Sequence, residues 1–141
     1  MAAAAPDPAW TVLLEEIGPA VIVAHSMAGQ DAFALVRARP DLVAALVVVE
    51  PVGCPGASPP AAMFGVPFYY VFGDHFEVRN MQGRFDACRA TAQALREGGG
   101  RAEGLQLPAE GIFGNTHLLM VDDNNAEIAA RIMAWLAETL E

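Results

Sequence analysis

The residues best suited to chemistry surround Ser26, in the run VAHSMAGQ at positions 23–30. Ser26 follows an apolar run and precedes a predicted helix, and the small residues Ala24 and Ala28 lie two positions to either side. A serine at such a strand-to-helix turn needs a strained backbone that lifts its hydroxyl clear of the sheet, and only small flanking side chains avoid a collision across the turn. The pattern therefore predicts a nucleophile elbow with Ser26 as the nucleophile. It also points the Met27 N–H toward the place where an oxyanion would form.

A serine hydroxyl is a weak nucleophile unless a base removes its proton, so one of the three histidines must reach Ser26. His25 adjoins the serine, but alternation along a strand points its side chain away, which favours packing or hydrogen bonding beneath the turn. His75 follows a predicted strand, in a place where an acid is more usual. His117 lies in the loop before the last predicted helix, and it completes the chain order serine, acid, histidine that is typical of α/β-hydrolases. We therefore expect His117 to be the base.

A carboxylate must orient that histidine, and Glu50, Asp74 and Glu77 are the candidates. The common arrangement places the acid after the strand that ends at Gly73, which nominates Asp74 or Glu77. Glu50 instead ends the strand expected next to the elbow strand, and its longer side chain can span the extra distance to a histidine. A carboxylate that closes an apolar run is also unusual for a residue that only meets water. At the level of individual residues, all three candidates stay open.

The spacing of apolar residues predicts an alternation of helices and strands. Helices are expected over residues 10–17, between Ser26 and Pro40, over 81–97 and from the 122–125 cluster to 140; strands are expected over 20–24, 42–49, 68–72 and 105–107. This order predicts an α/β fold with about four mostly parallel strands flanked by helices. The candidate residues then follow the carboxyl ends of strands, where ligands bind in open α/β sheets.

Composition limits the partners of this chain. Its 141 residues form one domain at most, and no uncharged apolar run approaches the roughly 18 to 20 residues that cross a bilayer. A formal net charge of −9 repels nucleic acid and anionic lipid surfaces but is compatible with a small neutral substrate. The glycine run 98–100 follows a predicted helix, whereas a phosphate-binding loop precedes one. The Asp122–Asn125 cluster is explained by helix capping instead of calcium binding. We expect no metal and no cofactor.

Four segments together resemble a small group of bacterial carboxylesterases of the α/β-hydrolase fold. They are Ala24-His25-Ser26, Val48-Val49-Glu50-Pro51, Val71-Phe72-Gly73-Asp74-His75 and Gly114-Asn115-Thr116-His117. The elbow is generic, whereas the strand-end Glu-Pro and the Asn-Thr-His loop single out the group, whose triad acid is a glutamate after the sixth strand. The resemblance implies that Ser26, His117 and Glu50 hydrolyse carboxylic esters through an acyl-enzyme, with Met27 in the oxyanion hole. Asp74 would then be a structural group at a strand end.

The resemblance covers nearly the whole chain but only the C-terminal half of the fold. We therefore expect a disordered Ala/Pro tail at residues 1–7 and the C-terminal portion of an α/β-hydrolase domain at residues 8–141. Four strands of the parent fold have no counterpart, nor does the loop that supplies the second oxyanion-hole donor. The elbow strand becomes an exposed apolar edge, which invites pairing with another chain. Two functions are therefore considered. The first is an ester hydrolase for small-molecule substrates. The second is a truncated or split module, inactive alone, that assembles through this edge either as a homo-oligomer or with a missing N-terminal half.

The cysteine pattern of the group is also shared. Cys54 lies in the loop after Glu50, and Cys88 lies on the inner face of a predicted helix, so the resemblance implies a disulfide that pins this loop. Two separate buried thiols are the alternative. A disulfide favours a periplasmic or secreted parent. The segment Met1–Ala5 has no basic n-region, so we read no signal peptide in it.

Overall fold

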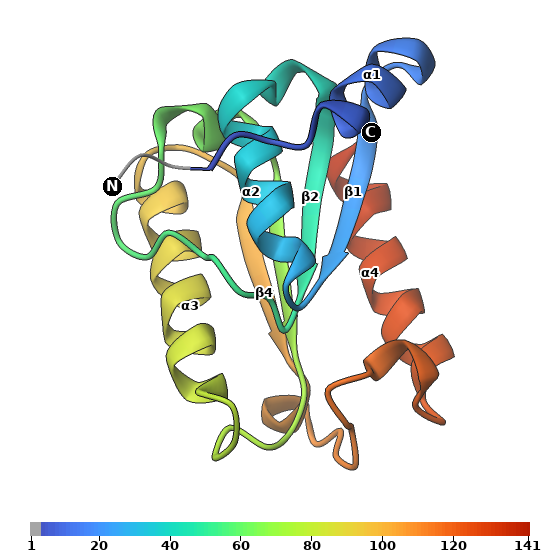
Figure 1. Ribbon diagram of the computed structural model, residues 1–141. Helices are drawn as coiled ribbons and strands as arrows, with labels where there is room; N and C mark the ends of the chain where they lie inside the picture. Colours follow the sequence, from blue (N-terminus) through green and yellow to red (C-terminus); the bar gives the residue numbers. More distant parts are fainter. Residues whose placement is uncertain (1–3) are drawn as a thin grey trace.

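The computed structural model describes residues 4–141, so the first three residues of the predicted tail at 1–7 lie outside it. Helices and strands alternate in the described chain (Figure 1), which is the predicted α/β order. The elements are α1 (Pro8–Ile17), β1 (Ala20–His25), α2 (Ala28–Ala38), β2 (Val43–Val49), β3 (Phe68–Phe72), α3 (Met81–Glu97), β4 (Ala102–Gln106) and α4 (Asn125–Thr139), with short 3-10 turns at Pro40–Leu42, Ala61–Gly65, Leu107–Glu110 and Leu119–Val121. None of the helices in this described part is long and apolar enough to cross a membrane.

The strands form one sheet in the order β1-β2-β3-β4, and all neighbours are parallel. β2 and β3 are buried along nearly their whole length because helices cover both faces, which explains why their sequences show no polar alternation. His25 pairs with Val49, and Val49 pairs with Val71. The first residues after β1, β2 and β3 therefore lie side by side at one end of the sheet.

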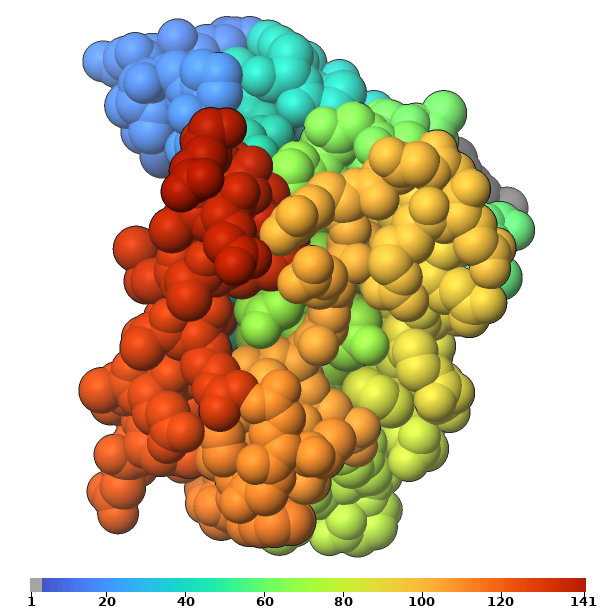
Figure 2. Space-filling view, turned by 180° about the vertical axis from the view of Figure 1, so that it is seen from behind, coloured from blue at the N-terminus to red at the C-terminus, as the bar shows by residue number. Residues whose placement is uncertain are grey.

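The two faces of the sheet carry separate cores. Helices α2 and α3 cover the front face in Figure 1, where Phe33, Phe68 and Phe85 belong to one buried cluster. Helix α4 covers the opposite face, shown in Figure 2, and there the Trp135 ring stacks on Tyr69 with centroids 4.8 Å apart. Burial of each large apolar side chain stabilises the fold by about 1.5 to 3 kcal/mol. The strands are thus fixed from both sides, and so are the loops at their carboxyl ends.

Strand β1 is one of the two edges of the sheet, and β4 is the other. β1 pairs with β2 alone among the described residues, and Val23 is 59% exposed although it lies within the strand. Helix α1 buries only Leu14 of its ten residues. An apolar edge strand of this kind is a template for pairing with another strand.

Two predicted elements differ from the structure. The fourth strand begins at Ala102 instead of residue 105. The Tyr70 ring lies directly over Gly104, where a Cβ would be 1.9 Å from Cζ of Tyr70. Pairing with β3 makes this stretch a strand despite its weak strand propensity. The prediction that the Asp122–Asn125 cluster caps the last helix is also not met. The capping residue of α4, Asn124, makes no side-chain cap bond, because its amide is bonded to Asn115.

Candidate active site

Ser26 occupies the turn between β1 and α2 in a conformation that few residues adopt. Its φ of 55° lies in the left-handed region, which costs about 1 to 3 kcal/mol for a residue other than glycine. The surrounding hydrogen bonds hold it there. The Ser26 N–H donates to the Val49 carbonyl at 3.1 Å, and the Ser26 carbonyl accepts from the N–H groups of Gly29 and Val52 at 3.0 and 2.9 Å. Ser26 is thus held in a strained turn where β1 leads into α2.

The turn at Ser26 also requires Gly29, which the sequence pattern did not single out. A Cβ at this position would lie 2.6 Å from the Val52 carbonyl oxygen and 2.8 Å from Pro51 Cβ. The first turn of α2 therefore packs directly against the loop after β2, and only glycine permits this approach. Ala24 and Ala28 were expected to be the small residues of the turn; Ala24 is buried, whereas Ala28 is exposed.

His117 lies between Ser26 and Glu50 and bonds to both. Its Nε2 is 2.9 Å from Ser26 Oγ, and its Nδ1 is 2.8 Å from Glu50 Oε1. A carboxylate only accepts, so Nδ1 carries the proton and Nε2 is left as the acceptor for the Ser26 hydroxyl. This is the tautomer that a general base for Ser26 needs. The His117 side chain is 19% exposed, so the ring is largely shielded from water.

Glu50 is buried to 1% exposure, and both of its carboxylate oxygens have donors. Oε1 faces His117, and Oε2 accepts from the Gly73 N–H at 2.9 Å. The residue has a φ of 41°, so the chain turns sharply where β2 ends. A buried carboxylate is costly unless it is paired and hydrogen-bonded, and Glu50 meets both conditions. It is the carboxylate of the three candidates that contacts the His117 ring.

The other two candidate acids lie elsewhere. Asp74 accepts from the backbone N–H groups of Gly114 and Asn115 at 2.9 and 3.2 Å, so it holds the loop that leads to His117. Glu77 is exposed and pairs with His75 at 3.1 Å. A backbone hydrogen bond at Glu77 and a second hydrogen bond from His75 hold the pKa of the Glu77 carboxyl below its ordinary value. His75 is thus engaged at the surface and does not reach Ser26.

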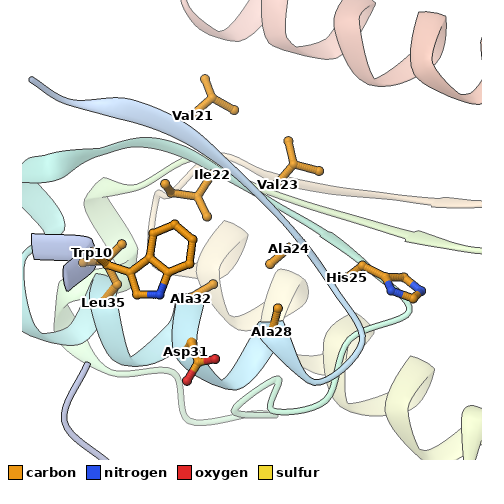
Figure 3. Close-up of a pocket in the computed structure, with 10 residues that line it drawn as sticks. All are labelled: Trp10, Val21, Ile22, Val23, Ala24, His25, Ala28, Asp31, Ala32 and Leu35. Atoms are coloured by element: carbon orange, nitrogen blue, oxygen red, sulfur yellow. The ribbon is translucent and has the colours of Figure 1, made fainter. Parts of the chain in front are cut away.

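His25 packs beside His117 instead of serving as a base for Ser26. Its Nε2–H donates to the His117 carbonyl oxygen at 2.7 Å, and the two ring centroids are 4.5 Å apart. Packing or hydrogen bonding was the expectation for His25, and its partner is His117. Figure 3 shows its ring at the end of β1.

Cys54 and Cys88 form a disulfide that joins the loop after β2 to α3. A second bond between the same segments runs from the Gly56 N–H to Thr91 Oγ1 at 2.8 Å. The segment that follows Glu50 is therefore attached to a helix of the front face. Residues 4–141 contain no group of three or more His, Cys, Asp or Glu side chains placed to hold a metal ion.

A cavity of about 620 Å³ adjoins His117. It lies between the loop after β3 and the loop that carries His117, and its apolar lining includes Val78, Leu118 and Val121. The volume is in the range of roughly 300 to 1,000 Å³ that small-molecule sites occupy. The site thus combines a serine, a histidine and a buried carboxylate in hydrogen-bonded order with space for an organic group beside the histidine.

Comparison with known proteins agrees with this fold. No protein-family model matches the chain. The probable secreted lipase phiG of Fungal sp. (strain ATCC 74256) is 27% identical over 178 aligned positions, which cover 91% of this chain and 48% of the lipase. A solved structure described as a novel bacterial esterase is 31% identical with a TM-score of 0.89, and the match covers 97% of this chain and 45% of that one.

The chain spans about half the length of both proteins that it matches. The predicted fold class, a partial α/β-hydrolase fold with about four mostly parallel strands flanked by helices, is confirmed by the four-stranded parallel sheet and by the esterase neighbour. Esterases and lipases are thus the proteins that this chain is similar to, and the similarity supports a hydrolase.

Proposed function

We propose that this chain carries the catalytic residues of a carboxylic ester hydrolase, with Ser26 as nucleophile, His117 as general base and acid, and Glu50 as the group that orients His117. The observation that carries the proposal is the continuous hydrogen-bonded order from Ser26 Oγ through His117 to the buried Glu50 carboxylate. The esterase and lipase relatives support the same reaction class.

The proposed reaction has two halves. Ser26 Oγ attacks the ester carbonyl carbon while its proton passes to His117 Nε2, and the carbonyl π electrons move onto the oxygen. The Met27 N–H, at the capping position of α2, donates to this oxyanion. When the intermediate collapses, the C–O bond to the alcohol breaks and His117 returns the proton to the leaving oxygen. Water, deprotonated by His117, then attacks the acyl-enzyme, and Ser26 is released with its proton while the acid departs.

Glu50 contributes to both halves without reacting itself. Its carboxylate keeps the Nδ1 proton in place, so Nε2 faces Ser26 as an acceptor, and it stabilises the imidazolium that forms when Nε2 is protonated. Because Glu50 is 1% exposed, little solvent screens this attraction. The substrate would be a small-molecule ester, part of which occupies the cavity beside His117.

Covalent labelling by a fluorophosphonate tests the proposal, because this reagent modifies only an activated serine. The chain has two serines, and the second, Ser58, is exposed and provides a matched control. We expect one label per chain in the unaltered protein and in Ser58→Ala, and none in Ser26→Ala. A folded, unlabelled wild-type chain would remove the proposal for this chain.

The open edge of β1 favours a second candidate, a module that is inactive alone and assembles through its sheet edge. Figure 3 shows Trp10 and Leu35 at one end of an apolar hollow beside β1, with Ala24, Ala28 and Ala32 along it. Val23 and Met27 are about 60% exposed next to it. Exposed backbone groups beside apolar side chains are the surface that strand addition requires.

The oligomeric state tests this candidate. If the edge drives assembly, sedimentation will show association that Val23→Lys abolishes, because a charge on an edge strand opposes pairing. Val12→Lys is the control, since Val12 is 62% exposed but lies on α1. A monomeric wild-type chain at all concentrations would rule out assembly through a second copy.

A further inference from the structure

The loop that carries His117 has no regular secondary structure, yet four of the five backbone N–H groups from Gly114 to Leu118 donate to side chains. The N–H groups of Gly114 and Asn115 donate to Asp74, the Thr116 N–H donates to Asp122 at 2.8 Å, and the Leu118 N–H donates to Thr116 Oγ1 at 3.1 Å. All four acceptors are side-chain oxygens. The position of the imidazole therefore depends on these side-chain oxygens and on the His25 ring, which donates to the His117 carbonyl oxygen at 2.7 Å.

Asp122 is the central acceptor of this arrangement. Its Oδ2 accepts from the Thr116 N–H at 2.8 Å and from Asn115 Nδ2 at 3.0 Å, and its Oδ1 accepts from Thr116 Oγ1 at 2.8 Å. Since Thr116 Oγ1 accepts in turn from the Leu118 N–H, one carboxylate fixes the backbone on both sides of His117. Hydrogen bonds to a charged group are shorter and stronger than those between neutral groups.

Asn115 links Asp122 to the start of α4. It is 1% exposed, and its amide exchanges two hydrogen bonds with the Asn124 amide, at 2.7 and 3.0 Å. The Asn115 amide is therefore satisfied although it is buried. The Asp122 and Asn124 side chains, which their sequence position suggests as helix caps, are instead bonded to the loop before His117.

The Asp122 carboxyl is held in its ionised form. Partial desolvation raises its pKa, but the hydrogen bonds from Thr116 and Asn115 outweigh that effect and lower the pKa below its ordinary value. An ionised carboxylate can accept all of these donors at once, whereas a protonated one would present a donor to one of them.

We propose that Asp122 is a positioning residue for the reaction inferred above: it fixes the backbone around His117 so that Nε2 stays within hydrogen-bond distance of Ser26 while Nδ1 faces Glu50. This inference rests on the proposed function. His117 must satisfy two partners, at 2.8 and 2.9 Å, from a loop without regular structure. A displacement of about 1 Å is enough to cost about 100-fold in rate.

The test compares Asp122→Asn with Asp123→Asn in the full 141-residue chain. Asp123 is the exposed neighbour and provides the matched control. Asparagine keeps the size of the side chain but presents an NH2 group to donors. We expect the fluorophosphonate labelling rate of Ser26 to fall about 10- to 100-fold in Asp122→Asn and to stay within about 2-fold in Asp123→Asn. With an ester substrate the loss should lie in kcat, with KM little changed.

Two further readouts separate positioning from general stability. Thr116→Val removes one of the bonds to Asp122 at an exposed site, so it should fold and reduce labelling by a smaller factor. The downfield proton resonance of His117 Nδ1–H, identified by its loss in His117→Gln, should shift or broaden in Asp122→Asn but not in Asp123→Asn. If folded Asp122→Asn and Thr116→Val are labelled at the wild-type rate with an unchanged resonance, the inference is overturned. If the wild-type chain itself is not labelled, the proposed function fails instead, and the resonance still reports whether Asp122 positions the ring.

Discussion

Replacing Glu50 by Gln should place His117 in the wrong tautomer. Glu50 Oε2 accepts from the Gly73 N–H at 2.9 Å, and this backbone group can only donate. The oxygen of a glutamine amide must therefore face Gly73, which turns its NH2 group toward His117 Nδ1. Nδ1 then has to accept, so the ring proton moves to Nε2. An imidazole with a proton on Nε2 donates to Ser26 and cannot take the serine proton.

The loss of activity expected in Glu50→Gln can be compared with the loss expected when a second carboxylate, Asp74, is replaced. A wrong tautomer in a serine, histidine and acid site costs about 10⁴-fold in kcat, or about 5.5 kcal/mol. Asp74→Asn leaves the tautomer intact and removes one of the two acceptors for the N–H groups of Gly114 and Asn115. The loop then shifts, and we expect a loss of no more than about 100-fold.

The assay is the steady-state hydrolysis of a p-nitrophenyl ester, with the labelling rate of Ser26 measured in parallel. Thermal unfolding shows whether both variants are folded at the assay temperature. A larger loss in folded Asp74→Asn than in folded Glu50→Gln would refute the assignment of Glu50 as the orienting acid.

Three further outcomes are expected. Gly29→Ala should lower the free energy of unfolding, measured in urea, by about 1 to 3 kcal/mol, because the added Cβ meets a backbone oxygen at 2.6 Å. Gly65→Ala, with open space around its Cβ, should change this free energy little. Equal effects of the two variants would contradict the close approach of Gly29 to the loop after β2. Thiol titration of the denatured, unreduced chain should find no free thiol, and two free thiols would contradict the disulfide. Reduction of this bond, which joins residues 34 positions apart, should lower the free energy of unfolding by about 3 to 4 kcal/mol. The pKa of Asp122 is lowered in the folded state, so its contribution to stability is full above its unfolded pKa of about 3.9 and is lost as the pH falls through its folded pKa. The difference in free energy of unfolding between wild type and Asp122→Asn should therefore shrink only at acid pH. A difference that grows on acidification would contradict this.

The sequence predicts the strands well where burial on both faces leaves a continuous apolar run. β2 and β3 are of this kind, and the expected strand over 68–72 matches β3 at both ends. β4 is the exception, because its first residues Ala102 to Gly104 become a strand through their pairing with β3 and through the Tyr70 ring above Gly104. Contacts of this kind join residues far apart in the chain, and local patterns do not contain them.

The choice among the three carboxylates could not be made from residue types because it depends on strand order. Parallel pairing of β1 with β2 places Glu50 one strand from Ser26, whereas Asp74 follows β3, two strands away. The order of residues in the chain predicted His117 as the base, and the structure places its ring 2.9 Å from Ser26 Oγ.

The hydrogen-bond partners of the Asp122–Asn125 side chains could also not be predicted from the sequence. Residue types that cap helices equally suit bonds to a nearby loop, and which one they make depends on where that loop runs. In this chain Asn115 and Thr116 lie close enough to Asp122 and Asn124 to accept or supply those bonds.

The central claim is that Ser26 becomes acylated by an ester substrate. Mass spectrometry of the chain, quenched in acid during hydrolysis of a p-nitrophenyl ester, tests this most directly. We predict one acyl group per chain on the peptide that contains Ser26, in wild type and in Ser58→Ala, and neither acyl group nor turnover in Ser26→Ala. Turnover in Ser26→Ala at the wild-type rate, or a folded wild-type chain that hydrolyses the ester and carries no acyl group on Ser26, would contradict the account.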